Sequence, residues 1–166
     1  MRLARTRTAR IVVGVAFIAL VVVIAAAAIV VIAIADSDER LPQITAYAYG
    51  ETITVEPAEY CSLDLQECTH GELANLNVPV GQPLQLSLPK EIADAPWRLV
   101  MVYQSPDGDL APQERYFTSG EADAVTVISD KSPAWQLNGV EIQLPSAVVD
   151  ENGLPHARAV WAIKTA

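Results

Sequence analysis

Reactive side chains are scarce in this sequence of 166 residues, which has only two cysteines and two histidines. It contains neither a G-x-S-x-G nucleophile elbow nor an H-E-x-x-H helix motif, the usual signatures of serine hydrolases and zinc peptidases. A glycine-rich loop that could cradle phosphate is also absent. We therefore expect a protein that is not an enzyme and that has no catalytic residue, cofactor or metal.

Acidic residues are missing from the first 35 positions, and basic residues are few after them. Four of the 11 basic residues, Arg2, Arg5, Arg7 and Arg10, lie in the first ten positions, whereas all 20 acidic residues follow position 35. Residues 36–166 therefore carry a net charge of −13 with histidine neutral. Because such a surface repels phosphate backbones, we expect no nucleic-acid partner.

A single long hydrophobic run, residues 11–35, has no charged or strongly polar side chain. A bilayer core needs roughly 20 helical residues, so this run predicts one transmembrane helix in the plasma membrane. Arginines precede the run and acidic residues follow it, so the positive-inside rule places residues 1–10 in the cytoplasm and the C-terminal part outside it. Cleavage after Ala35 remains an alternative, but the run is longer than the usual 7–15 residues of a cleavable signal peptide. We prefer an uncleaved signal anchor.

The rest of the chain predicts a short acidic linker, residues 36–41, and one exported domain, residues 42–166. All 11 prolines lie between Pro42 and Pro155, which leaves no room there for a long helix. Apolar residues alternate with polar ones, as in half-buried strands, and turn sequences at 105–108 and 150–153 predict two hairpins. This pattern predicts an all-β fold of seven to nine short strands, an immunoglobulin-like β-sandwich or, as the alternative, a small barrel. The expected strands are residues 43–49, 52–56, 84–88, 97–104, 113–118, 124–129, 137–144 and 157–163.

Two cysteines in an exported domain usually pair, so we expect a disulfide between Cys61 and Cys68. A soft-metal site of both cysteines with His70, and His156 as a distant fourth ligand, is the alternative, although the spacing matches no standard zinc motif. Three tryptophans occur, and we expect Trp97 and Trp161 in the core. Trp135 is the best candidate for exposure, and we name His70, Trp135 and His156 as a candidate ligand or partner surface.

Several stretches resemble an uncharacterised actinobacterial family, a domain of unknown function whose members are membrane-anchored, exported β-rich proteins. The matching stretches are PQITAYAYG, EYCSLDLQEC, VPVGQPLQLSLPKEIADAPWRLVMVYQ, RYFTSGE, GVEIQLPSAVVDENG and RAVWAI. The resemblance implies a cell-envelope location and no activity. The stretch VGQPLQLSLP is also similar to chagasin-like protease inhibitors, but their Asn-Pro-Thr-Thr-Gly loop is missing.

We therefore expect a non-catalytic, membrane-tethered extracytoplasmic interaction or scaffolding module of the cell envelope, with another membrane or envelope protein as its partner. The alternatives are a small-ligand or metal-binding domain, an enzyme of unfamiliar type and a protease-inhibitor-like domain.

Overall fold

The computed structural model of the protein describes residues 3–35 and 41–166. The chain divides into two compact units, one up to Arg40 and the other Leu41–Ala166. The predicted linker, residues 36–41, lies outside the described residues except for Leu41, as do the first two positions of the basic N-terminus.

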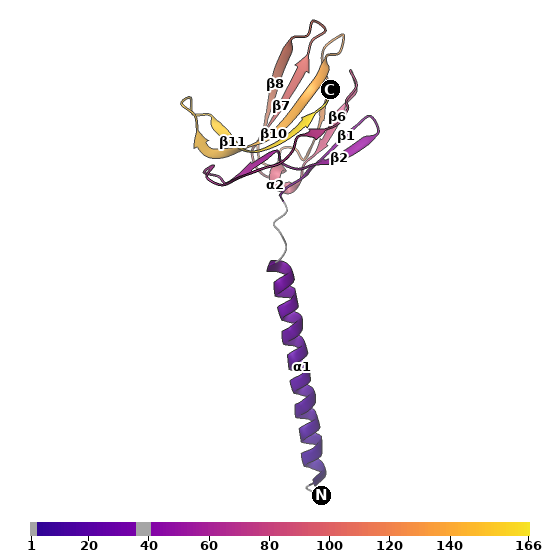
Figure 1. Ribbon diagram of the computed structural model, residues 1–166, viewed down its shortest axis with the longest axis vertical. Helices are drawn as coiled ribbons and strands as arrows, with labels where there is room; N and C mark the ends of the chain where they lie inside the picture. The colour runs from indigo at the N-terminus through magenta and orange to yellow at the C-terminus, as the bar shows by residue number, and fades with distance from the viewer. Residues whose placement is uncertain (1–2, 36–40) are drawn as a thin grey trace. The chain divides into compact units, whose positions relative to one another are not determined.

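Helix α1 (Leu3–Ala35) contains the long hydrophobic run (Figure 1). It begins eight residues before the predicted span, because the preceding alanine, leucine and arginine residues are good helix formers and no proline interrupts them. The window Val12–Ile29 has a mean hydropathy of 3.1, and none of it is buried within the structure. Among the described residues, this helix is the one long and apolar enough to cross a membrane.

The second unit is a sandwich of two sheets, which confirms the all-β prediction. One sheet has the strand order β2-β1-β6-β9, and the other has the order β4-β3-β11-β10-β7-β8, with β5 paired to β11. All pairs are antiparallel except β5 with β11. The strands are β1 (Ile44–Ala48), β2 (Glu51–Val55), β3 (Glu59–Cys61), β4 (Cys68–His70), β5 (Ala74–Asn75), β6 (Leu84–Ser87), β7 (Trp97–Gln104), β8 (Leu110–Phe117), β9 (Ala124–Val127), β10 (Gln136–Val149) and β11 (Pro155–Lys164).

All eight expected strands are present, and the described residues add β3, β4 and β5, each of two or three residues. A short helix, α2 (Lys90–Ala93), precedes β7. The inward side chains of both sheets form one apolar core, in which Trp97 is 2% and Trp161 0% exposed. The expectation that these two tryptophans belong to the core is therefore confirmed.

Strands β10 and β11 form a long hairpin that bends away from β7 and β8 and reaches out to one side (Figure 1). Their register shifts on both sides of Pro145, where the ladder is interrupted. A proline cannot donate a ladder hydrogen bond, so an irregular position is where a sheet tolerates it. The bend separates the outer part of the hairpin from β7 and leaves a fork between them.

The beginning of the second unit is tied to its core. The carbonyl oxygen of Pro42 accepts a hydrogen bond of 2.8 Å from the indole Nε1 of Trp161. Strand β1 follows directly and pairs with β2 on one side and β6 on the other. The first residues after the linker are therefore held by the sandwich interior.

Candidate functional site

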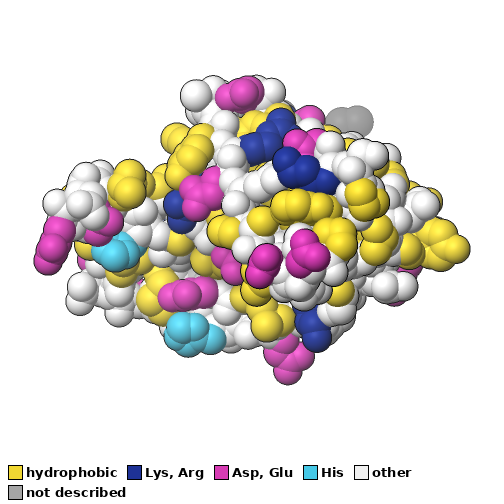
Figure 2. Space-filling view, turned by 90° about the horizontal axis from the view of Figure 1, so that it is seen from above, with side chains coloured by type: hydrophobic (Ala, Val, Ile, Leu, Met, Phe, Trp, Pro, Cys, Tyr) yellow, Lys and Arg dark blue, Asp and Glu magenta, His cyan; other side chains and the backbone are white. Residues whose placement is uncertain are grey.

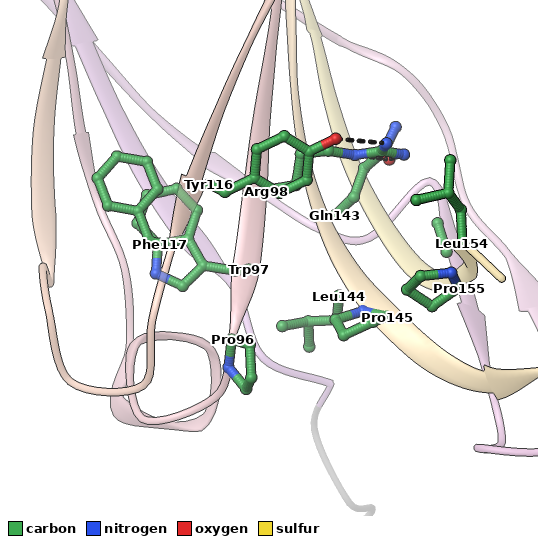
Figure 3. A pocket seen from close by; sticks show the side chains of 11 residues that line it. Pro96, Trp97, Arg98, Tyr116, Phe117, Gln143, Leu144, Pro145, Leu154 and Pro155 are labelled. Carbon is green, nitrogen blue, oxygen red and sulfur yellow. Dashed lines mark hydrogen bonds between the residues drawn. The ribbon is translucent and has the colours of Figure 1, made fainter. Parts of the chain in front are cut away.

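A pocket of about 180 Å³ lies in the fork between the bent β10–β11 hairpin and strands β7 and β8, and we call it the fork pocket. Figure 3 shows Leu154 and Pro155 on one side of it and Trp97 and Phe117 on the other. The lining residues come from four strands and their ends: Pro96, Trp97, Arg98, Tyr116, Phe117, Gln143, Leu144, Pro145, Leu154, Pro155 and Ala157.

The inner wall of the fork pocket is aromatic and rigid. Trp97 and Phe117 are paired positions of β7 and β8, and their rings stack on each other. Both side chains are buried, with exposed fractions of 2% and 7%. Because buried aromatic rings in close packing have few alternative rotamers, this wall keeps its shape without a ligand.

A polar network borders the pocket on the outer face of the sheet. The guanidinium of Arg98 donates from Nε to Oε1 of Gln143 at 3.1 Å, and a second N–H, from Nη2, reaches the same oxygen. On its other side Nη1 lies 3.5 Å from Oε2 of Glu114, which also accepts a 2.6 Å hydrogen bond from the hydroxyl of Tyr116. The Arg98 side chain is 32% exposed, so the ion pair contributes little to stability. The network instead fixes a cation beside the apolar recess.

Exposed apolar side chains form the rim of the fork pocket. Tyr116 is 67% and Leu154 61% exposed. The turn that carries Leu154 is closed by the Asp150 carboxylate, which accepts N–H groups of Asn152 at 2.8 Å and Leu154 at 2.9 Å. The hydrogen bond from the Leu154 amide, followed by those from Asn152, holds the pKa of Asp150 below its usual value. This ionised cap keeps Leu154 in place at the rim.

The chemistry of the lining favours binding. Of the described lining residues, none is a serine, cysteine, histidine or carboxylic acid, so the pocket wall offers neither a common nucleophile nor its base. It offers an apolar recess with guanidinium and amide groups at one edge. A site of this kind can seat an apolar group and hydrogen-bond a neighbouring carbonyl or carboxylate.

The structure does not bring the sequence-predicted surface residues together. His70 on β4 and His156 on β11 are both exposed, and both histidines are visible among acidic side chains in Figure 2. Strand β3 lies between β4 and β11, and Glu59 pairs with both His70 and Val160. His156 is four positions from Val160, about 13 Å along the strand. The two histidines are therefore too far apart to share one ion.

Trp135 is half-buried and packs against the core, so it is less exposed than expected. The ammonium group of Lys131 lies 5.6 Å from the centre of its ring, within cation–π range. The backbone N–H of Trp135 donates a hydrogen bond of 3.0 Å to the hydroxyl of Ser129. Trp135 thus holds the loop before β10, and it does not line the fork pocket.

Cys61 and Cys68 form a disulfide across the β3–β4 pair. Together with Glu59 they are the one group of three candidate metal ligands among the described residues. A disulfide has no thiolate to offer a metal, so in this oxidised form the group lacks its soft ligands. His70 and His156 do not belong to the group.

Sequence reasoning missed the residues that make the fork pocket. Arg98 and Tyr116 follow ordinary strand alternation, which indicates that they point outward but not that they meet. Leu154 follows the predicted turn, where an exposed leucine next to a proline was the one available signal. The pocket exists because the hairpin bends, and the sequence pattern does not reveal the bend.

The family model described as "Protein of unknown function (DUF2771)" matches residues 37–166, which include the whole sandwich. The chain belongs to the DUF2771 family. It is also similar to an uncharacterised protein of Mycobacterium bovis, with 35% identity over 130 residues, covering 74% of this chain and 76% of that one. An uncharacterised protein of Mycobacterium tuberculosis matches with the same identity and coverage. No solved structure matches the chain. Membership of DUF2771 therefore agrees with the resemblance seen in the sequence and brings no activity with it.

Proposed function

We propose that this protein is a non-catalytic, membrane-tethered extracytoplasmic module of the cell envelope that docks another membrane or envelope protein at the fork pocket. The observation that supports this most strongly is the size of the pocket, about 180 Å³. Sites for small molecules usually enclose about 300–1,000 Å³. A cavity of about 150 Å³ holds one benzene ring, so the fork pocket suits one bulky apolar side chain of a partner.

The rim residues are of the kinds that dominate protein interfaces. Tyrosine and arginine are enriched among the residues that contribute most to binding energy, and anchors of this sort surround a central pocket. Tyr116 and Arg98 lie beside the recess, and the network with Gln143 and Glu114 already orders the Arg98 side chain. Because the Arg98 side chain is already ordered, it loses less conformational entropy on binding. Its N–H groups can then donate to a backbone carbonyl or a carboxylate of a protein partner.

Export of the sandwich is part of the same proposal. The apolar helix, with arginines before it and acidic residues after it, supports a signal anchor with its N-terminus in the cytoplasm. The disulfide between Cys61 and Cys68 supports an oxidising compartment. In this arrangement the fork pocket is available to partners on the outer side of the plasma membrane.

Site-specific photo-crosslinking in cells tests the docking surface. A benzophenone amino acid replaces Leu154 in the full-length chain, and its matched control replaces Leu110, which is also 61% exposed and follows the other long hairpin turn. We expect one discrete protein adduct from position 154 and none from position 110. Mass spectrometry of the adduct then identifies the partner.

Pocket filling is the second arm of this test. Ala157→Phe places a ring in the fork pocket, whereas Ala124→Phe places one on the exposed outer surface of β9 in the other sheet. The adduct from position 154 should disappear in the Ala157→Phe background and persist in the Ala124→Phe background. Identical adducts from positions 154 and 110, or an adduct indifferent to Ala157→Phe, would overturn the proposal.

A further inference from the structure

The outer face of the β2-β1-β6-β9 sheet carries no charged side chain across two complete rows of paired residues. In one row Tyr47 pairs with Thr52 and Gln85, and Gln85 pairs with Thr126. In the next row Thr45 pairs with Thr54 and Ser87, and Ser87 pairs with Ala124. We call this surface the hydroxyl face after the hydroxyl groups of Thr45, Tyr47, Thr52, Thr54, Ser87 and Thr126.

Such a surface is unusual on this domain, because the Leu41–Ala166 unit has 17 acidic and 6 basic residues. Strand propensity favours threonine and tyrosine, but it acts on both sheets alike. The outer face of the other sheet nevertheless carries Arg98, Glu114 and Glu141 at comparable strand positions. Strand propensity therefore does not explain why these two rows carry no charge, whereas the next row along the same face ends in Glu56, beside Gln43.

The hydroxyl face is hollowed over β1, β6 and β9 into a shallow depression of about 360 Å³. This volume lies within the range of small-ligand sites, about 300–1,000 Å³, unlike that of the fork pocket. Tyr47 lines the depression with 43% of its surface exposed. Within the described part of the chain, no side-chain hydrogen bond engages Tyr47, Gln85 or Thr126, so their polar groups remain available to a ligand.

We propose that the hydroxyl face binds an uncharged polysaccharide. A sugar ring has an apolar C–H face that packs on an aromatic ring, and its rim of hydroxyl groups both donates and accepts hydrogen bonds. Tyr47 supplies the aromatic surface, and the threonine, serine and glutamine side chains supply donors and acceptors of both kinds. The four strands span about 14 Å, which accommodates a short run of sugar units.

Charge complementarity selects the neutral ligand. A cationic partner would favour the acidic surfaces elsewhere on the domain, and an anionic polymer would be repelled by the net charge of the unit. A neutral chain loses little on approaching either kind of surface, and it leaves no unpaired ion when it covers the hydroxyl face. Binding should therefore depend only weakly on salt concentration.

Retention on immobilised polysaccharides tests this inference. The full-length chain is purified in a polyoxyethylene detergent, which has no sugar headgroup to compete, and is applied to cellulose, chitin, dextran and arabinogalactan, with alginate as an anionic comparison. We expect retention on at least one neutral polymer, unchanged between low and high salt, and none on alginate. Tyr47→Ala should weaken binding at least tenfold. Thr126→Asp should do the same, because it leaves an ion beneath the covering sugar.

Leu110→Asp is the matched control, since it adds the same charge at an exposed strand residue of the other sheet and should leave retention unchanged. Thermal unfolding checks that each variant remains folded, and Thr126→Asp stands in if Tyr47→Ala does not fold. Absence of retention on every neutral polymer, or equal retention on alginate, would overturn the inference. A dimer of the full chain that dissociates in Tyr47→Ala would also overturn it, in favour of contact with a second copy.

Discussion

The indole ring of Trp97 lies flat on the phenyl ring of Phe117, with ring centroids 3.9 Å apart and ring planes 8° apart. The two residues face each other across the β7–β8 pair. The stack belongs to the core on one side and forms the wall of the fork pocket on the other. The stability of the sandwich and the shape of the fork pocket therefore depend on the same two side chains.

Phe117→Ala should destabilise the sandwich by about 3 kcal/mol, because it removes a buried ring and leaves a cavity beside Trp97. The melting temperature of the full chain in detergent should fall by on the order of 10 °C. Tryptophan fluorescence during heating measures this change. Tyr116→Ala is the control, since the neighbouring Tyr116 is 67% exposed and its loss should cost far less. Equal melting temperatures for the two variants would contradict the role of the stack.

Reduction of the disulfide should destabilise the sandwich by about 2.5 kcal/mol, the chain-entropy value for a loop of about eight residues. Cys61 and Cys68 are seven positions apart, so the closed loop is short and the effect is at the low end of the usual range. Thermal unfolding with and without reductant measures the effect. Cys61→Ala/Cys68→Ala is the control, because its melting temperature should not respond to reductant.

The turn at the tip of the β10–β11 hairpin should loosen in acid. The pKa of Asp150 is lowered by the amide of Leu154, so the ionised cap is fully present above the ordinary aspartate value of about 3.9 and is lost as pH falls through the lower folded value. The amide proton shift of Leu154, followed by NMR, should report a midpoint below 3.9. In Asp150→Asn, which keeps an oxygen acceptor, that transition should be absent. A midpoint at or above the ordinary value would show that the amide does not stabilise the carboxylate.

The C-terminus should lie outside the cytoplasm. Alkaline phosphatase fused after Ala166 should be active, and a fluorescent protein that matures only in a reducing compartment should stay dark at the same site. Replacing Arg2, Arg5, Arg7 and Arg10 with glutamate should reduce the phosphatase signal, because it removes the charge that orients the helix. A fluorescent wild-type fusion would refute both the signal anchor and the export of the sandwich.

Every strand of four or more residues was predicted from alternation and turn sequences, and the alternation is clearest in β1, β6, β7 and β9, where buried residues alternate with more exposed ones. Strands β3, β4 and β5 were missed, since two or three residues are too few to show a period. Strand β8 begins earlier than expected and includes Pro112. It is the edge strand beyond β7, where a missing N–H can face solvent.

The candidate site was much less accessible to sequence reasoning than the fold. His70, His156 and Trp135 stood out because histidine and tryptophan are rare in the chain, but rarity does not bring side chains together. The fork pocket is lined by residues that lie dozens of positions apart in the sequence, such as Pro96 and Leu154, or Arg98 and Gln143. These long-range contacts depend on the bend at Pro145 and on the strand order, and neither can be predicted from one sequence alone.

The hydrogen bond from Trp161 to Pro42 has a mechanical consequence. Any tension on the chain before Pro42 reaches the sandwich at the start of β1, where the Pro42 carbonyl accepts a hydrogen bond from the buried indole of Trp161. Strand β1 has a neighbour on each side, so it cannot peel off one ladder at a time. Force applied at this end of the domain therefore loads both ladders and the core together.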